Sequence, residues 1–252
     1  MTKRILFLII ALQLLISSTA AAIACNDGGV IDIPVDCSYD YPKPGMPEWD
    51  TAKSGEERYK VCEIPEHILL CISTEKLARL VTLYPGLWVH IGGYNSFTDN
   101  NGYGGLDRIF ANFNGIRELS KRENALIYLC DEYLLELQKF EYDIDNRWNS
   151  VIQLQAIECL IGYYKLHNNI SKDNLKKILK NLWIGYNEKI KYSDYFKGMF
   201  AGNLFARANI IIKIAPTLSE IFEVNNKSVL YRGIATADMI NTMDSLTTEL
   251  IK

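Results

Sequence analysis

Apolar side chains recur every three or four residues along the chain from Pro65 to the carboxyl end, which is the spacing of one covered face of an α-helix. The longest such series predicts a helix over 123–137, and Ser120 and Glu123 ahead of it have the spacing of a capping box. Its apolar face is formed by Leu126, Leu129, Cys130, Tyr133, Leu134 and Leu137. No segment alternates apolar and polar residues as a half-buried strand does, so the pattern predicts an all-α fold.

Further helices are predicted on both sides of this one. Two short ones are expected over 65–72 and 73–84, because Pro85 ends the second. The others cover 106–119, with a break at Asn114-Gly115, and 148–166, 171–190, 194–215 and 228–251. The helix pair at 123–166 is followed about 48 residues later by a similar pair at 171–214, without a repeat motif. A multi-helix bundle and a stacked helical array both fit this pattern.

The first residues have the pattern of a secretory leader. Lys3 and Arg4 precede an apolar run from Ile5 to Ile16, which is shorter than the roughly 20 residues that span a membrane. Small residues then lead to Ala22-Ile23-Ala24, which favours cleavage just before Cys25. We therefore interpret residues 1–24 as a signal peptide and expect the protein to be exported.

Ala22-Ile23-Ala24-Cys25 also resembles the lipobox of bacterial lipoproteins, although Ala22 stands where leucine is usual. We expect lipid on Cys25 and hence a membrane anchor in the cell envelope, on its periplasmic side or at the cell surface. Ordinary secretion with a plain terminal cysteine is the alternative. Residues 25–60 are rich in proline and glycine and predict an extended tether, with Tyr41 and Trp49 as candidates for contact with the folded part.

The remaining residues, 61–252, are long enough for one all-α globular domain with its own hydrophobic core. Removal of residues 1–24 takes away Lys3 and Arg4 and no acid, so the net charge falls from −3 to −5. A mildly acidic exported protein is not expected to bind nucleic acid.

Six cysteines are present, and lipid on Cys25 would leave five. Cys37 and Cys62 flank the predicted tether and are the expected disulfide in an oxidising compartment. Cys130 and Cys159 lie among apolar residues of predicted helices and are expected in the core. No cysteine or histidine pair has the short spacing of a zinc site, so we predict no metal and no cofactor.

The most irregular stretch, residues 84–107, is rich in glycine and asparagine but also carries several aromatic residues. Exposed aromatic side chains on such a loop suit binding of a protein or a glycan. The candidate binding residues are Trp88, Tyr94, Asn95, Tyr103 and, in the next helical segment, Asn114. The alternative, which we favour, is that the aromatic side chains fold back onto the helices. A calcium loop starting at Asp99 is not supported, because Phe110 stands where a bidentate glutamate is needed.

No catalytic residue is predicted. The three histidines, His67, His90 and His167, do not stand beside a nucleophile in any known motif. Glu158 lies in an apolar helix and could serve as an acid, but the narrow polar seam that it forms with Gln155 and Lys165 is more simply a face toward solvent or a partner helix. A row of lysines, which could contact anionic lipid or glycan, is interpreted as a solvated helix face: Lys172, Lys176, Lys177 and Lys180.

Three segments in order, CEIPEHILLCISTEKLARLVTLYP, Tyr94-Asn95 and FNGIRELSKRENA, resemble a group of exported bacterial proteins of unknown function. The resemblance covers residues 62–125 and implies export and an all-helical fold, without a catalytic residue to carry over. Ile72 and Gly86 depart from the pattern. The shared Asn114 and Gly115 are expected, with Tyr94-Asn95, to bridge a loop to a helix break by hydrogen bonds.

Two functional hypotheses follow from the sequence. The first is a non-enzymatic, envelope-associated lipoprotein whose helical domain binds a protein or a glycan. The second is a secreted hydrolase with a site assembled around residues 88–114. A purely structural envelope component, without an exposed aromatic patch, is a third.

Overall fold

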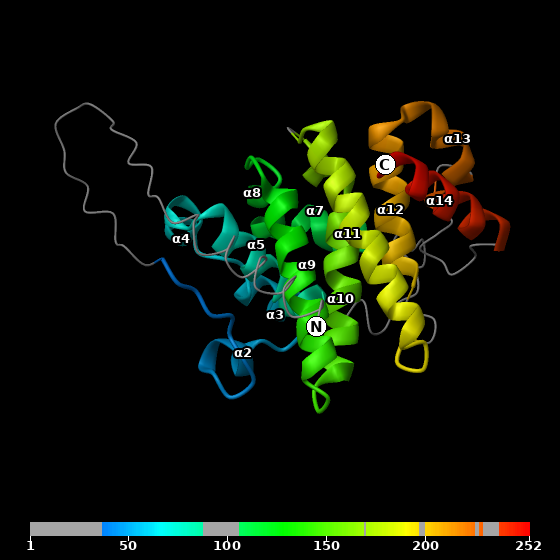
Figure 1. The fold of residues 1–252 in the computed structure, drawn as a ribbon. Coiled ribbons are helices and arrows are strands. Elements are labelled where there is room, and N and C mark those ends of the chain that lie inside the picture. Colours follow the sequence, from blue (N-terminus) through cyan, green and yellow to red (C-terminus); the bar gives the residue numbers. More distant parts are fainter. Residues whose placement is uncertain (1–36, 88–105, 169, 197–199, 225–226, 229–236) are drawn as a thin grey trace, which may run out of the picture. The chain divides into compact units, whose positions relative to one another are not determined.

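The computed structural model confirms the all-α class (Figure 1). It describes residues 37–87, 106–168, 170–196, 200–224, 227–228 and 237–252. The chain divides after Pro34 into two units, and the second, Val35–Lys252, contains all the described residues.

Residues 37–60, which the sequence assigns to the tether, lie in the same compact unit as residues 61–252. Two helices lie here, α2 (Pro47–Thr51) and α3 (Gly55–Val61). Tyr41 is buried and its hydroxyl donates to the carbonyl of Leu80, 2.9 Å away. The aromatic side chains of Tyr41 and Trp49 pack against the core, and their apolar surface offsets the low helical tendency of the surrounding prolines and glycines.

The next helices match the sequence pattern closely. They are α4 (Glu66–Cys71), α5 (Thr74–Thr82), α7 (Leu106–Asn112) and α8 (Asn114–Leu119). Ser73 caps α5, because its hydroxyl accepts from the amide of Lys76 at 3.2 Å. The interruption between α7 and α8 falls at Phe113, one residue before the predicted break.

The predicted capping box is wrong. Helix α9 (Ala125–Tyr142) begins after Asn124, whose backbone is left-handed (φ 61°) and whose side chain makes no capping bond. The hydroxyl of Ser120 instead donates to the carbonyl of Arg117 at 2.8 Å, at the end of α8. A serine next to a helix end can bond either to the helix before it or to the one after it, and the tight turn at residues 120–124 selects the first.

Four helices form the centre of the fold: α9, α10 (Arg147–Ile161), α11 (Lys172–Lys191) and α12 (Ala201–Ile214). A short 3₁₀-helix, η1 (Tyr164–His167), connects the two pairs. Helix α9 packs on α10 and α11, and α12 packs on α10 and α11 (Figure 1). Each hairpin therefore stacks on the other, α9 beside α11 and α10 beside α12, which is the arrangement of a stacked array rather than of an up-and-down bundle.

The carboxyl-terminal part adds smaller elements. They are η2 (Pro216–Leu218), α13 (Ser219–Phe222), the antiparallel strands β1 (Glu223–Val224) and β2 (Lys227–Ser228), and α14 (Ala237–Leu250). Helix α14 packs against α11 and α12. Within the described ranges, every helix falls short of the length and apolar character that a membrane span requires.

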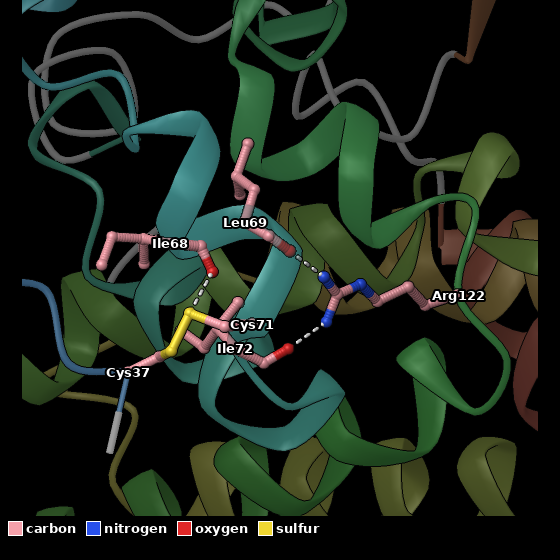
Figure 2. Close-up of a disulfide and its surroundings, with 6 residues drawn as sticks. All are labelled: Cys37, Ile68, Leu69, Cys71, Ile72 and Arg122. Carbon is pink, nitrogen blue, oxygen red and sulfur yellow. Dashed lines mark hydrogen bonds between the residues drawn. A yellow bond between two sulfur atoms is a disulfide. The ribbon is translucent and has the colours of Figure 1, made fainter. Parts of the chain in front are cut away.

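The disulfide joins Cys37 to Cys71, whose Cα atoms are 6.0 Å apart, and not to Cys62 as predicted (Figure 2). Cys62 is a free, buried thiol at the end of α3. Proximity in sequence favoured Cys62, but the helical turn at 66–71 brings Cys71 back toward Cys37 while Cys62 points into the core. The predicted burial of Cys130 and Cys159 is confirmed.

Arg122 holds the same helix from its other side. Its guanidinium donates to the carbonyls of Leu69, at 2.5 Å, and Ile72, at 2.6 Å (Figure 2). These carbonyls lie at the carboxyl end of α4, where no further helical turn can satisfy them. The disulfide and Arg122 together fix α4 between the start of the folded unit and the α8–α9 turn.

Candidate functional site

Most of the predicted site lies outside the described residues. This holds for Cys25, for Trp88, His90, Tyr94, Asn95 and Tyr103 of the loop, and for the stretch that begins at Asp99. Around the described residues, no group of three or more histidine, cysteine or carboxylate side chains could hold a metal ion.

Asn114 is the one predicted loop contact that the structure describes, and its role is structural. Its amide oxygen accepts from the backbone N–H of Ile64 at 3.0 Å, and its amide nitrogen donates to the carbonyl of Ile64 at 2.8 Å. At Gly115 a Cβ atom would stand 2.6 Å from the Phe113 ring and 2.9 Å from Ile64. The pair Asn114-Gly115 thus ties the start of α8 to the segment before α4.

Glu158 is the centre of a buried polar network to which all four central helices contribute. Its carboxylate accepts from the hydroxyl of Tyr133 on α9 at 2.9 Å, from the amide of Asn203 on α12 at 3.1 Å, and from the ammonium of Lys189 on α11 at 2.6 Å. All four side chains are fully buried. The predicted seam therefore faces partner helices at Glu158, whereas the side chain of Lys165 on η1 is exposed.

The network requires close packing of α9 against α11. A Cβ atom on Gly185 would lie 2.0 Å from the hydroxyl oxygen of Tyr133, so glycine is needed there for the hydroxyl to reach Glu158. Burial, followed by the charge of Glu158, raises the pKa of Tyr133 well above its usual value. A fully covered carboxylate paired with lysine, amide and phenol cannot contact a substrate, and the arrangement is a tie between helices.

Arg207 on α12 is a second buried charge, at the contact with α14. Its guanidinium donates to Thr247 and Asp244, both at 2.8 Å, and lies 4.6 Å from the ring centre of Trp183 and 4.9 Å from that of Tyr186. These contacts hold the last helix against the array. The cation is compensated on its own chain, so it too serves the fold.

His167 belongs to the interior as well. Its Nε2 donates to the carbonyl of Ile161 at 2.6 Å, and burial lowers the pKa of His167 to about 4. His67 is exposed on α4.

Apolar side chains are exposed where the α9–α10 turn meets the end of α11. We call this surface the tip (Tyr142–Trp148, with Tyr192 and Tyr195). Three large apolar side chains point to solvent here: Tyr142 and Ile144 are each 67% exposed and Trp148 is 61% exposed. The ring of Trp148 lies 6.0 Å from that of Tyr195. The α9–α10 turn and the end of α11 both lie at the lower end of the central helices in Figure 1.

The backbone of the tip is held by contacts of Arg147 and Asn146. The guanidinium of Arg147 lies 5.3 to 5.4 Å from the ring centres of Phe140, Tyr192 and Tyr195, and it donates to the carbonyl of Phe140 at 3.1 Å. Within the turn, the amide side chain of Asn146 donates to the carboxylate of Asp143 at 2.9 Å. The exposed side chains are therefore presented by a fixed backbone, which lowers the entropy cost of binding.

Sequence reasoning missed this surface. A signal was present in Glu141-Tyr142-Asp143-Ile144-Asp145, where two large apolar residues alternate with three carboxylates across the end of α9 and the turn that follows it. Turns seldom carry such apolar residues unless these are packed or used for contact. The lysine row on α11, by contrast, faces solvent as predicted: Lys172, Lys177 and Lys180 are exposed and Lys176 is half-buried.

Comparisons of the chain with protein-family models, with curated proteins and with solved structures found no match. Its function has to be inferred from its own residues.

Proposed function

We propose that this is an exported, non-enzymatic protein, held at the cell envelope by lipid on Cys25, whose helical domain binds another protein through the tip. The observation that carries the binding role is the exposure of Tyr142 at the end of α9, Ile144 in the turn and Trp148 at the start of α10. Trp, Tyr and Arg are the residues that most often dominate the free energy of protein–protein contacts.

Two observations support the location. The leader and the sequence around Cys25 have the pattern of an exported, lipid-modified chain. The Cys37–Cys71 disulfide closes 34 residues of chain, and such bonds form and persist in oxidising compartments outside the cytosol.

The stacked arrangement supports the binding role. In arrays of helical hairpins the turns gather on one side and commonly form the contact surface. Here the α9–α10 turn and the end of α11 lie together, because the ring of Tyr195 contacts both Trp148 and Phe140. A protein is favoured over a glycan because Ile144, a branched aliphatic side chain, is as exposed as the aromatic Tyr142.

The anchor is tested with Cys25→Ala in the full chain. Lipidated protein should enter the detergent phase, and the variant should be lost from it because no acyl chain remains. Partitioning that does not change on substitution would reject the lipid anchor while leaving the binding role untouched.

The binding role is tested by placing a photoreactive amino acid at Ile144 in the cells that make the protein. Illumination should yield a covalent adduct with a second protein. The matched control is the same amino acid at Leu70 on α4, which is 82% exposed but stands apart from the tip.

Trp148→Ala in the Ile144 probe should reduce the adduct at least tenfold, because a central aromatic contact commonly contributes more than about 1.4 kcal/mol. The ring touches only the partly exposed Tyr195 among described aromatic contacts, so the fold should persist. Equal adducts at positions 144 and 70, or none at 144, would contradict binding at the tip.

A further inference from the structure

We propose that the partner of the tip is a protein segment in which lysine or arginine alternates with apolar residues. This inference rests on the proposed function and adds the chemistry of the partner. It follows from the charges that surround Tyr142 and Ile144, all of which lie on the described part of the chain.

The two apolar side chains of the turn are enclosed by carboxylates. Glu141, Asp143 and Asp145 alternate with Tyr142 and Ile144, and all five are exposed. No ion pair among the described residues includes any of the three acids. The carboxylate of Asp143 accepts hydrogen bonds only from Asn146, within the turn. The carboxylates are therefore available to a cationic partner.

The nearby cations are already engaged. Lys139 pairs with Glu136 at 2.8 Å, and Lys191 pairs with Glu188 at 2.5 Å while also interacting electrostatically with Glu141. The half-buried guanidinium of Arg147 lies among three aromatic rings and donates to the carbonyls of Phe140 and Glu141. The outward field of the turn is thus negative, although aromatic and aliphatic surface provides the contact area.

The combination of exposed carboxylates with exposed apolar side chains favours some classes of partner over others. Nucleic acid and anionic lipid would be repelled by three carboxylates, and a wholly apolar segment would leave those carboxylates desolvated without partners. A segment that carries cations between apolar side chains satisfies both features at once. Its association should be faster and tighter at low salt, because exposed charges are screened within about 8 Å at physiological ionic strength.

The test uses three eight-residue peptides and the full chain. In the first peptide lysine alternates with leucine; in the second and third, glutamine or glutamate replaces lysine. Binding is measured from the backbone amide shifts of residues 141–148 by NMR. The lysine peptide should shift these amides, the glutamine peptide should bind about tenfold more weakly, and the glutamate peptide should not bind.

Two matched variants locate the effect. Glu141→Gln combined with Asp145→Asn should weaken binding of the lysine peptide about three- to tenfold and reduce its salt dependence, because two of the three carboxylates lose their charge with little change in shape. Tyr164→Ser removes an aromatic side chain of similar exposure on η1, next to Lys165, and should leave binding unchanged.

Each outcome separates the partner chemistry from the binding role. Equal binding of the lysine and glutamine peptides, or no effect of the Glu141 and Asp145 changes, would overturn the cationic partner. A photoadduct at position 144 would still support protein binding in that case. Shifts of the tip amides with a neutral oligosaccharide and with none of the peptides would favour a glycan ligand and overturn both proposals.

Discussion

The polar network around Glu158 and the tip contain similar residue types in opposite surroundings. The network places a carboxylate, an ammonium, an amide and a phenol in the interior, where each meets another. The tip places carboxylates beside tyrosine and tryptophan in water, where the apolar rings remain uncovered. In the network the polar side chains are buried, and at the tip the apolar side chains are exposed. Each region reverses the usual distribution.

The difference separates residues that serve the fold from residues that serve contact. A buried charge persists only if its own chain compensates it, and Lys189 and Glu158 compensate each other. Trp148 leaves most of its apolar surface in water beside the equally exposed Tyr142 and Ile144, and a cluster of this kind favours a contact role. A buried charged side chain is thus a weaker indication of function here than an exposed apolar one.

The largest expected effect comes from breaking the network. Glu158→Ala should lower the free energy of unfolding by about 3 to 5 kcal/mol, because it leaves the ammonium of Lys189 buried without a carboxylate. The measurement is denaturant unfolding followed by circular dichroism, with Ile144→Ser at the tip as the control, expected within about 0.5 kcal/mol of the parent.

A double variant distinguishes pairing from packing. Glu158→Leu with Lys189→Met removes both charges while filling the space, so it should be clearly more stable than Glu158→Ala. If Glu158→Ala costs no more than Ile144→Ser, the network does not hold the helices together and the contrast between the two regions fails.

Much of the fold could be predicted because its cause is local. The three-and-four spacing placed α4, α5, α10 and α11 within a few residues of their observed bounds, and Ser171 caps α11 by accepting from Asn174 as expected from its position. The errors concern choices between two partners. Ser120 bonds backward rather than forward, and Cys37 pairs with Cys71 rather than Cys62, because tertiary packing decides both.

The candidate site could be predicted only in part. Periodicity shows which face of a helix is apolar but not which polar residue lies between two helices, so the partners of Glu158 on three other helices were invisible. The tip was not predicted, because residues 138–147 fall between two predicted helices and periodicity does not show which of them are exposed. Exposure is a property of the folded chain, and it made Ile144 and Trp148 stand out.

Lowering the pH is expected to have a smaller effect on the free energy of unfolding, through the buried His167. Burial lowers the pKa of His167 to about 4, against an unfolded value of 6.5. Above pH 6.5 neither state binds the proton and His167 contributes no pH dependence. Between pH 6.5 and 4 the unfolded chain takes up a proton that the folded chain refuses, so the free energy of unfolding falls by up to about 3 kcal/mol across this window.

His167→Gln isolates this contribution, because glutamine can still donate to the carbonyl of Ile161 but does not titrate in this range. Thermal unfolding is measured at intervals from pH 7 to pH 4 for the parent and the variant. The difference between them should change steadily below pH 6.5, since the carboxylates that titrate in the same range are common to both proteins. A constant difference would mean that His167 is protonated in the folded state. The interior would then tolerate an additional cation, against the rule that its buried charges are compensated within the chain.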